Sequence, residues 1–220
     1  MYRRVRTRTS SSSRTILLAS SSYVGLMPDP HIVEATIYTQ RLELHHLAGD
    51  RLVTLFEEPE SQLPYEGRDY SNPHRVLVDD QFPLHWRVTQ VNQDVASNKW
   101  FLRWMVLRSS REIVGSTSFH NPPNDEGMLE IGLGVHPDFQ GRGYAKEALL
   151  GMWSWAVEQP GVSVLRYTVS TTNVASTAII TGFGFAHVGV QVDEKDGPEE
   201  IFEMTAREFT QRLKTEWRTP

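Results

Sequence analysis

The amino-acid sequence predicts a mixed α/β domain, and three observations carry that prediction. Segments with strand-like alternation and segments with helical spacing of apolar residues follow one another from Ile37 onward. The clearest helix, over 143–158, carries an apolar stripe and ends before Pro160-Gly161. The 220 residues are enough for one well-packed domain, and they contain no internal repeat.

The first 28 residues differ in composition from the rest of the chain. They contain five arginines and seven serines, and the first acidic residue is Asp29. Such an Arg-rich, Ser-rich and acid-poor segment has the composition of an organelle transit peptide, and the simpler alternative is a disordered leader upstream of a start at Met27. We therefore expect residues 1–28 to be a leader and residues 29–215 to form a single folded domain. The expected location is the cytoplasm, or the mitochondrion if the leader is a transit peptide.

Charge and cysteine content exclude several classes of function. Without the five leader arginines, 17 basic residues stand against 27 acidic residues, a formal charge of −10. This balance argues against nucleic acid as a partner and favours cationic or amine substrates. No apolar run approaches the roughly 18 residues of a membrane span. The absence of cysteine excludes disulfides, thiolate metal sites and a covalent acyl-cysteine intermediate.

The N-terminal half begins with a strand and a helix. Alternation over 37–47 predicts the strand, and apolar residues at helical spacing over 47–59 predict a helix that stops at Pro59. Residues 60–80 are rich in Pro, Gly, Asp and Asn, which predicts a long loop of the kind that shapes a substrate mouth. A second helix is expected over 82–95.

The remaining elements alternate between strands and helices. Residues 99–120 predict a hairpin that turns at 108–111, and residues 128–135 predict the strand that precedes the clearest helix. After that helix the sequence predicts, in order, a strand over 164–169, a short helix over 173–181 and a final hairpin that turns around Asp196-Gly197.

The stretch "QGRGYA" over 140–145 places two glycines where a strand gives way to a helix. No Ser, Thr, Asp or Asn caps the first turn of that helix, so its amides lack side-chain partners. Unpaired amides at the positive end of the helix dipole bind anions, and Arg142 adds a cationic group. A P-loop and a dinucleotide fingerprint are both excluded, because Lys146 occupies the place of the third glycine and no Gly-Lys-Ser/Thr follows. We expect this turn to bind a phosphate-bearing cofactor.

Together with three other stretches, this turn resembles the GNAT superfamily of acyl-CoA-dependent N-acetyltransferases, in its RimJ/RimL-like branch. "QGRGYA" is similar to the family's pyrophosphate loop, and "TQRLELHHL" to the branch's first strand. "EIGLGVHP" resembles the strand before the loop, and "NVASTAIITGFGF" resembles the Asn-x-x-Ser and Gly-Phe pattern after it. The four stretches lie in the expected order and cover about residues 37–206.

The resemblance implies a central mixed, mostly antiparallel sheet, flanked by helices and splayed around the cofactor, acetyl-CoA. Asn173 has a simpler interpretation as the N-cap of the short helix, and it can act both as this cap and as a cofactor contact. The cofactor-binding residues that the resemblance implies are Leu133, Gly134 and Val135 through their backbone, Gln140, Gly141, Arg142, Gly143, Tyr144 and Ala145 around the pyrophosphate, and Asn173 and Ser176 on the pantetheine or adenosine side.

Amine attack on a thioester requires a proton acceptor, because an amine with a pKa near 10 is mostly protonated at neutral pH. Glu130 is the first candidate, since it begins the central strand and aligns with the branch's Glu-Ile-Gly; its simpler interpretation is a surface carboxylate or ion-pair partner. His120 is the reserve candidate. Ile180 stands where many family members carry a Tyr that protonates the leaving thiolate. His45 and His46 point to opposite faces of a strand and do not suggest a metal pair.

The predicted function is direct acetyl transfer from acetyl-CoA to a primary amine in a ternary complex. The acceptor is a small-molecule amine or a protein N-terminus, and no metal, nucleic acid or membrane partner is expected. The alternative is a non-catalytic acyl-CoA-binding or sensor module of the same fold. The sequence leaves the acceptor and the oligomeric state open, with a homodimer among the states.

Overall fold

The structure, a computed structural model, describes residues 31, 33–193 and 197–217. The predicted leader over 1–28 lies outside the described residues, as does Asp196 of the predicted final turn. Within the described ranges, no helix has the length and apolar content needed to cross a membrane.

One eight-stranded sheet organises the described chain, in the order β1-β2-β3-β4-β5-β6-β8-β7. Every pairing among these strands is antiparallel except that of β5 with β6. The strands are β1 (Ile37–Tyr38), β2 (Leu42–His46), β3 (Arg103–Leu107), β4 (Ile113–Phe119), β5 (Met128–Val135), β6 (Val164–Ser170), β7 (Ala186–Asp193) and β8 (Gly197–Thr205).

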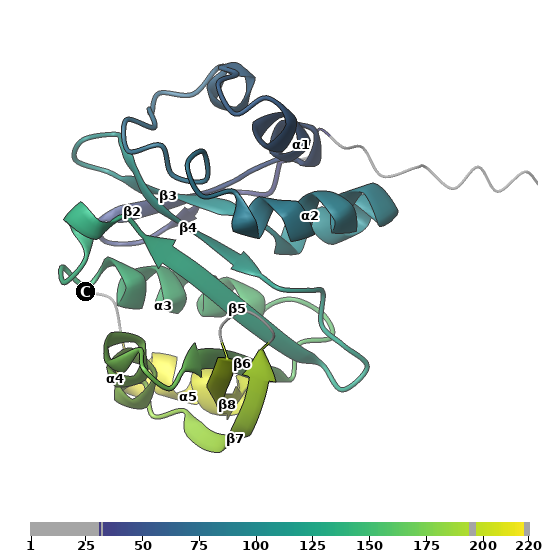
Figure 1. The fold of residues 1–220 in the computed structure, drawn as a ribbon. Helices are drawn as coiled ribbons and strands as arrows, with labels where there is room; N and C mark the ends of the chain where they lie inside the picture. The colour runs from purple at the N-terminus through teal and green to yellow at the C-terminus, as the bar shows by residue number, and fades with distance from the viewer. Residues whose placement is uncertain (1–30, 32, 194–196, 218–220) are drawn as a thin grey trace, which may run out of the picture.

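Helices cover both faces of the sheet. Figure 1 shows α1 and α2 on one side of the strands and α3 on the other, with α4 and α5 beside the β6-β8-β7 end. In the described residues the α-helices are α1 (Gly49–Glu57), α2 (Phe82–Gln93), α3 (Tyr144–Ala156), α4 (Val174–Gly182) and α5 (Ala206–Thr215). The 3-10 helices of the same residues are η1 (Leu63–Tyr65), η2 (Val95–Trp100) and η3 (Pro137–Phe139).

Each face of the sheet has its own apolar core. Leu52 and Leu84, from α1 and α2, pack with Trp104 of β3 on one face. On the other face Met152 and Trp153 of α3 pack against β5, β6 and the C-terminal helices. The alternation of side chains along each strand separates the two sets, since successive residues point to opposite faces. The expected mixed α/β fold with a mostly antiparallel sheet is therefore confirmed.

The first strand departs from its prediction. A single strand over 37–47 was the expectation, but β1 and β2 are two short strands that pair with each other through a turn. The Thr39 amide donates to the Leu42 carbonyl at 2.9 Å, which closes the turn. The Thr39 hydroxyl and the Arg41 amide donate to Glu147 of α3, each at 2.6 Å. These contacts replace the ladder bonds that a continuous strand would make.

Candidate active site

The parallel strands β5 and β6 separate part-way along their length. Their pairing ends at Glu130 and Arg166, whereas β5 continues to Val135 with β4 as its only partner in the described chain. The second half of β6 pairs with β8 on its far side. One edge of β5 therefore carries backbone groups that face no neighbouring strand among the described residues.

The register between β4 and β5 identifies those backbone groups. The His120 amide donates to the Glu130 carbonyl at 2.9 Å, and the His136 amide donates to the Val114 carbonyl at 2.8 Å. Because antiparallel strands alternate between hydrogen-bonded and non-hydrogen-bonded pairs, the polar groups of Leu133 and Val135 point away from β4, into the gap. The backbone N–H and C=O of Gly134 point toward β4. This residue therefore offers the gap no backbone hydrogen bonds, and its only contribution is that it has no side chain to occupy space.

A glycine-rich turn lies at the end of this open edge. Gly141 and Gly143 have φ angles of 72° and 81°, in the left-handed region that favours glycine. No side chain caps the α3 helix that follows. Gln140 donates from Nε2 to the Val135 carbonyl at 2.9 Å, which ties the turn to the end of β5. Uncapped amides beside two glycines in left-handed conformations provide hydrogen-bond donors suited to an anion, and the binding of a pyrophosphate here stays a prediction.

Arg142 points back along the chain toward the preceding segment. Its guanidinium donates to the Asp138 carbonyl at 2.8 Å and lies 5.2 Å from the centre of the Phe139 ring. A second arginine, Arg41, donates to the Arg142 carbonyl at 2.9 Å and lies over the Tyr144 ring at 4.6 Å. The sequence alone assigns no role to Arg41.

Glu147 connects Arg41 to the first turn of α3. Its carboxylate accepts hydrogen bonds from the Thr39 hydroxyl, the Arg41 amide and the Arg41 guanidinium, at 2.6, 2.6 and 2.7 Å. Burial raises the pKa of Glu147, but these donors outweigh burial and hold the pKa below its ordinary value. An ionised carboxylate in a helix's first turn is favoured by the helix dipole. These contacts hold the first turn of α3 in place, and none of them involves the backbone amides of the glycine turn.

Asn173 and Ser176 lie at the start of α4. The Asn173 side-chain oxygen accepts a hydrogen bond from the Ser176 amide at 3.1 Å, so Asn173 is the N-cap of this helix. Asn173 is exposed and Ser176 half-buried. Beyond the cap, their roles on the pantetheine or adenosine side stay predictions.

Glu130 and His120 lie together at the base of the gap. His120 Nδ1 is 3.4 Å from Glu130 Oε1, and the Thr168 hydroxyl of β6 donates to the same carboxylate oxygen. The imidazole is the more accessible of the two side chains, at 40% exposed against 17% for the carboxylate. The two candidates for the proton acceptor are thus one cluster rather than alternatives at separate places.

Opposing effects set the protonation state of Glu130. Burial raises the pKa of this carboxyl, whereas the hydrogen bond and charge of His120, the Thr168 hydroxyl and the Arg166 charge lower it further than burial raises it. The pKa of Glu130 is therefore below its ordinary value, and the side chain is a carboxylate at neutral pH.

The position of His120 is fixed by neighbours that sequence reasoning missed. Arg87 and Gln90 of α2 donate to the His120 carbonyl at 3.0 and 2.8 Å. Arg87 also donates to the Ser118 hydroxyl at 2.9 Å, and burial lowers the pKa of Arg87 to about 10. The imidazole lies over Gly132, where an added Cβ would be 2.8 Å from Nε2. A side chain at this position would require the ring to shift.

Comparisons with known proteins agree with this architecture. A family model described as "Acetyltransferase (GNAT) domain" matches residues 41–186. The FsC-acetyl coenzyme A-N(2)-transacetylase of Aspergillus fumigatus is 27% identical over 176 residues, 75% of this chain and 71% of that protein. The uncharacterized N-acetyltransferase YjdG of Bacillus subtilis is 31% identical over 88 residues, 40% of this chain, and the match spans only about half of that protein, 52%.

A solved structure shares the fold. RimL, a ribosomal L7/L12 alpha-N-protein acetyltransferase in complex with coenzyme A, superposes with a TM-score of 0.54 at 13% identity, over 78% of this chain and 99% of RimL. At that identity the likeness concerns the fold alone. The family model, in contrast, covers more than half of the sequence. The chain therefore belongs to the GNAT acetyltransferase domain family.

Proposed function

We propose that this protein transfers the acetyl group of acetyl-CoA directly to the nitrogen of a primary amine. One observation carries the proposal: the open edge of β5 runs from the His120–Glu130 pair to an uncapped glycine turn. Acetyl-CoA, which has an extended arm that ends in a thioester and an anionic pyrophosphate at the other end of that arm, fits such an edge. Its arm pairs with the backbone of Leu133 and Val135, and its pyrophosphate accepts hydrogen bonds from the amides of 141–145.

His120 accepts the proton of the attacking amine in this proposal. The pKa of Glu130 is lowered, which makes its carboxylate a weak base for an amine, and the Thr168 hydroxyl already occupies one of its oxygens. The imidazole of His120 is the more exposed of the two side chains, and a neutral imidazole has a nitrogen lone pair that can accept a proton. Glu130 then acts as a positioning residue, which orients the ring and stabilises the imidazolium that forms. This assignment reverses the order of the two candidates derived from the sequence.

The transfer step needs no covalent enzyme intermediate. The amine nitrogen attacks the thioester carbonyl, its proton passes to His120, and the carbon–sulfur bond breaks to release CoA thiolate. Backbone amides at the open edge of β5 stabilise the oxyanion of the tetrahedral intermediate. Ile180 is fully buried and offers no acid, so the thiolate takes its proton from water.

The nature of the acceptor rests on charge and on the relatives. The acidic body attracts cationic amines, and both the fungal relative and RimL are named for acetyl transfer to nitrogen. We include both small-molecule amines and protein N-termini, and we assign the chain to the RimJ/RimL-like branch on the four matched stretches. The cytoplasm is the proposed location, or the mitochondrion if residues 1–28 are a transit peptide.

Release of CoA thiol from acetyl-CoA, measured with a thiol reagent across a panel of amines, tests the proposal. The chain has no cysteine, so the reagent reports only the product. We expect amine-dependent release, reduced by about 100-fold or more in His120→Gln. If Glu130 itself were the base, Glu130→Gln would abolish release while His120→Gln kept it. A non-catalytic acyl-CoA-binding module would bind acetyl-CoA and release no thiol with any amine.

A further inference from the structure

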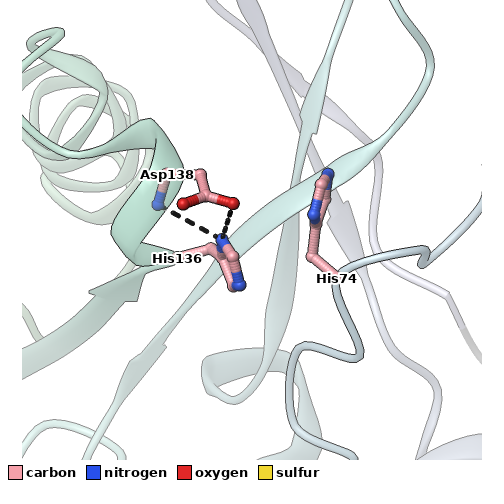
Figure 2. A group of neighbouring side chains, drawn as sticks. All are labelled: His74, His136 and Asp138. Atoms are coloured by element: carbon pink, nitrogen blue, oxygen red, sulfur yellow. Dashed lines mark hydrogen bonds and ion pairs between the residues drawn. The ribbon is translucent and has the colours of Figure 1, made fainter.

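Three potential metal ligands meet beside the segment that leads into the glycine turn. His74 comes from the loop between η1 and α2, His136 follows the last residue of β5, and Asp138 lies in η3. Figure 2 shows His136 between the other two side chains. One ligand atom from each residue lies within 4.8 Å of the others, and His136 Nδ1 is 3.9 Å from Asp138 Oδ2.

The imidazole of His74 carries an unsatisfied polar atom. Its Nε2 is buried and has no hydrogen-bond partner among the described residues. The ring packs against His136 and Phe139, with ring centres 4.9 and 4.8 Å apart. An aromatic or aliphatic side chain would fill the same space without the free-energy cost of a buried, unpaired nitrogen. The unpaired nitrogen is therefore available to a ligand.

His136 offers a lone pair toward Asp138. Its Nδ1 accepts a hydrogen bond from the Asp138 amide, at the long distance of 3.4 Å. Nδ1 is one of the two imidazole nitrogens through which histidine binds metals. The Asp138 carboxylate is 77% exposed, so its side chain is free to rotate toward the imidazole.

The loop that carries His74 is held in place by its own contacts. Asn72 accepts from the Val76 amide at 2.9 Å and donates to the Val76 carbonyl at 3.0 Å. Arg75 adopts a left-handed φ of 52° and forms ion pairs with Glu60 and Asp79 at 2.8 and 2.7 Å. A ligand on such a loop is positioned before the metal arrives, which favours binding.

We propose that His74, His136 and Asp138 bind a divalent transition metal ion of the zinc class. Two imidazoles and one carboxylate suit zinc and its neighbours rather than magnesium or calcium, which prefer oxygen ligands. Metal–ligand bonds of about 2.1 Å place tetrahedral ligands roughly 3.4 Å apart, so small rotations of the three side chains, of which only Asp138 is exposed, close the site. Water completes the coordination.

The site is separate from the proposed proton acceptor. Six residue steps of extended chain, roughly 20 Å, separate His136 from Glu130, the residue that contacts the proposed acceptor His120. The bound metal would link the loop between η1 and α2 to the segment ahead of the glycine turn. The sequence predicted no metal, because His74 is remote from the other ligands and none of the familiar ligand spacings is present.

Calorimetric titration of Zn²⁺ into the chelator-treated full chain, without CoA, tests the proposal. We expect one zinc ion per chain and a binding constant lowered by about tenfold or more in each of His74→Asn, His136→Asn and Asp138→Asn. Asparagine at 136 retains the capping of the Asp138 amide, which limits damage to the fold. His85→Asn removes an exposed histidine of α2 outside the cluster and serves as the matched control.

Two further measurements separate metal binding from folding. Zn²⁺ at about 100 times its dissociation constant should raise the wild-type melting temperature by about 5 °C, and by much less in His74→Asn. Co²⁺ in place of Zn²⁺ should give visible absorption bands of histidine-bound cobalt that disappear in His74→Asn. Equal zinc affinity in the wild type and in all three variants would overturn the proposal, as would the absence of binding by a wild-type chain that melts cooperatively.

Discussion

Replacing Gly132 with alanine tests the role of His120 without changing either ionisable side chain. The ideal Cβ of residue 132 lies 2.8 Å from His120 Nε2. Non-bonded heavy atoms at rest are about 3.5 Å apart or more, so the ring must retreat by roughly 0.7 Å. Because Nδ1 lies 3.4 Å from Glu130, a shift of this size changes the contact between the imidazole and its carboxylate partner.

The expected loss follows from that displacement. A misplacement of about 1 Å at a reacting group costs on the order of 100-fold in rate, so kcat/KM should fall by roughly 10- to 100-fold, equivalent to about 1.4 to 2.7 kcal/mol. The clash is with the far end of one side chain, and alanine reduces the freedom of the unfolded chain. Thermal stability should therefore change little, and acetyl-CoA affinity should be retained.

The assay is CoA thiol release at saturating acetyl-CoA with the best amine acceptor, together with calorimetric acetyl-CoA affinity. Gly189→Ala is the matched control, because an added Cβ on that β7 residue meets nothing within 4 Å. A double-mutant cycle gives the sharpest comparison: in a His120→Gln background, Gly132→Ala should have no further effect on kcat/KM.

Two results would refute this reasoning. Wild-type kcat/KM in Gly132→Ala would show that the position of the His120 ring does not matter for transfer. A loss of acetyl-CoA affinity as large as the loss of kcat/KM would show that the added methyl group obstructs the cofactor instead.

Three further predictions concern the cofactor turn and the helix starts. Gly143→Asp should weaken acetyl-CoA binding by more than about tenfold, because it places a carboxylate at the anion site and strains a φ of 81°; unchanged calorimetric affinity would contradict the assigned turn. Glu147→Gln should cost about 1 to 3 kcal/mol at pH 7. The pKa of Glu147 in the folded protein is lowered from 4.5, so the difference in unfolding free energy between wild type and Glu147→Gln should be complete above pH 4.5 and should disappear as the pH falls through the folded pKa. Denaturant titrations from pH 7 to 3 measure this difference. A difference that stays constant over this range would be inconsistent with an ionised Glu147. Asn173→Ala should cost about 1 kcal/mol of unfolding free energy and Asn173→Asp almost none, and equal losses would argue against capping.

The sequence predicted local elements well where one pattern dominated. The α3 helix and the strand before it were predicted because an apolar stripe and a glycine-rich turn are both local signals. The break between β1 and β2 was not predicted, because it depends on Glu147, which lies on a distant helix. The α5 helix was missed, although Phe209 and Leu213 lie at helical spacing and Thr205 caps its start.

The candidate site was predicted in its parts but not in its geometry. The position of Glu130 at the start of the central strand and the family resemblance selected it, whereas His120 was chosen for its position at the end of the preceding strand. The pairing of β4 with β5 brings the two side chains into contact. Gly132 had no assigned role, since the need for a glycine arises from the ring that lies over it. The His74 and His136 contact is likewise a product of tertiary structure, because the two residues belong to different segments of the chain.

Calorimetric titration of the wild-type chain with acetyl-CoA, CoA and ATP tests the central claim most directly. The open edge of β5 and the glycine turn predict binding of both CoA species in the micromolar range, on the order of −8 kcal/mol, and no measurable binding of ATP. ATP has the phosphates but not the pantetheine arm that pairs with β5. Failure of either CoA species to bind a cooperatively folded chain, or binding of ATP as tight as that of acetyl-CoA, would contradict the account.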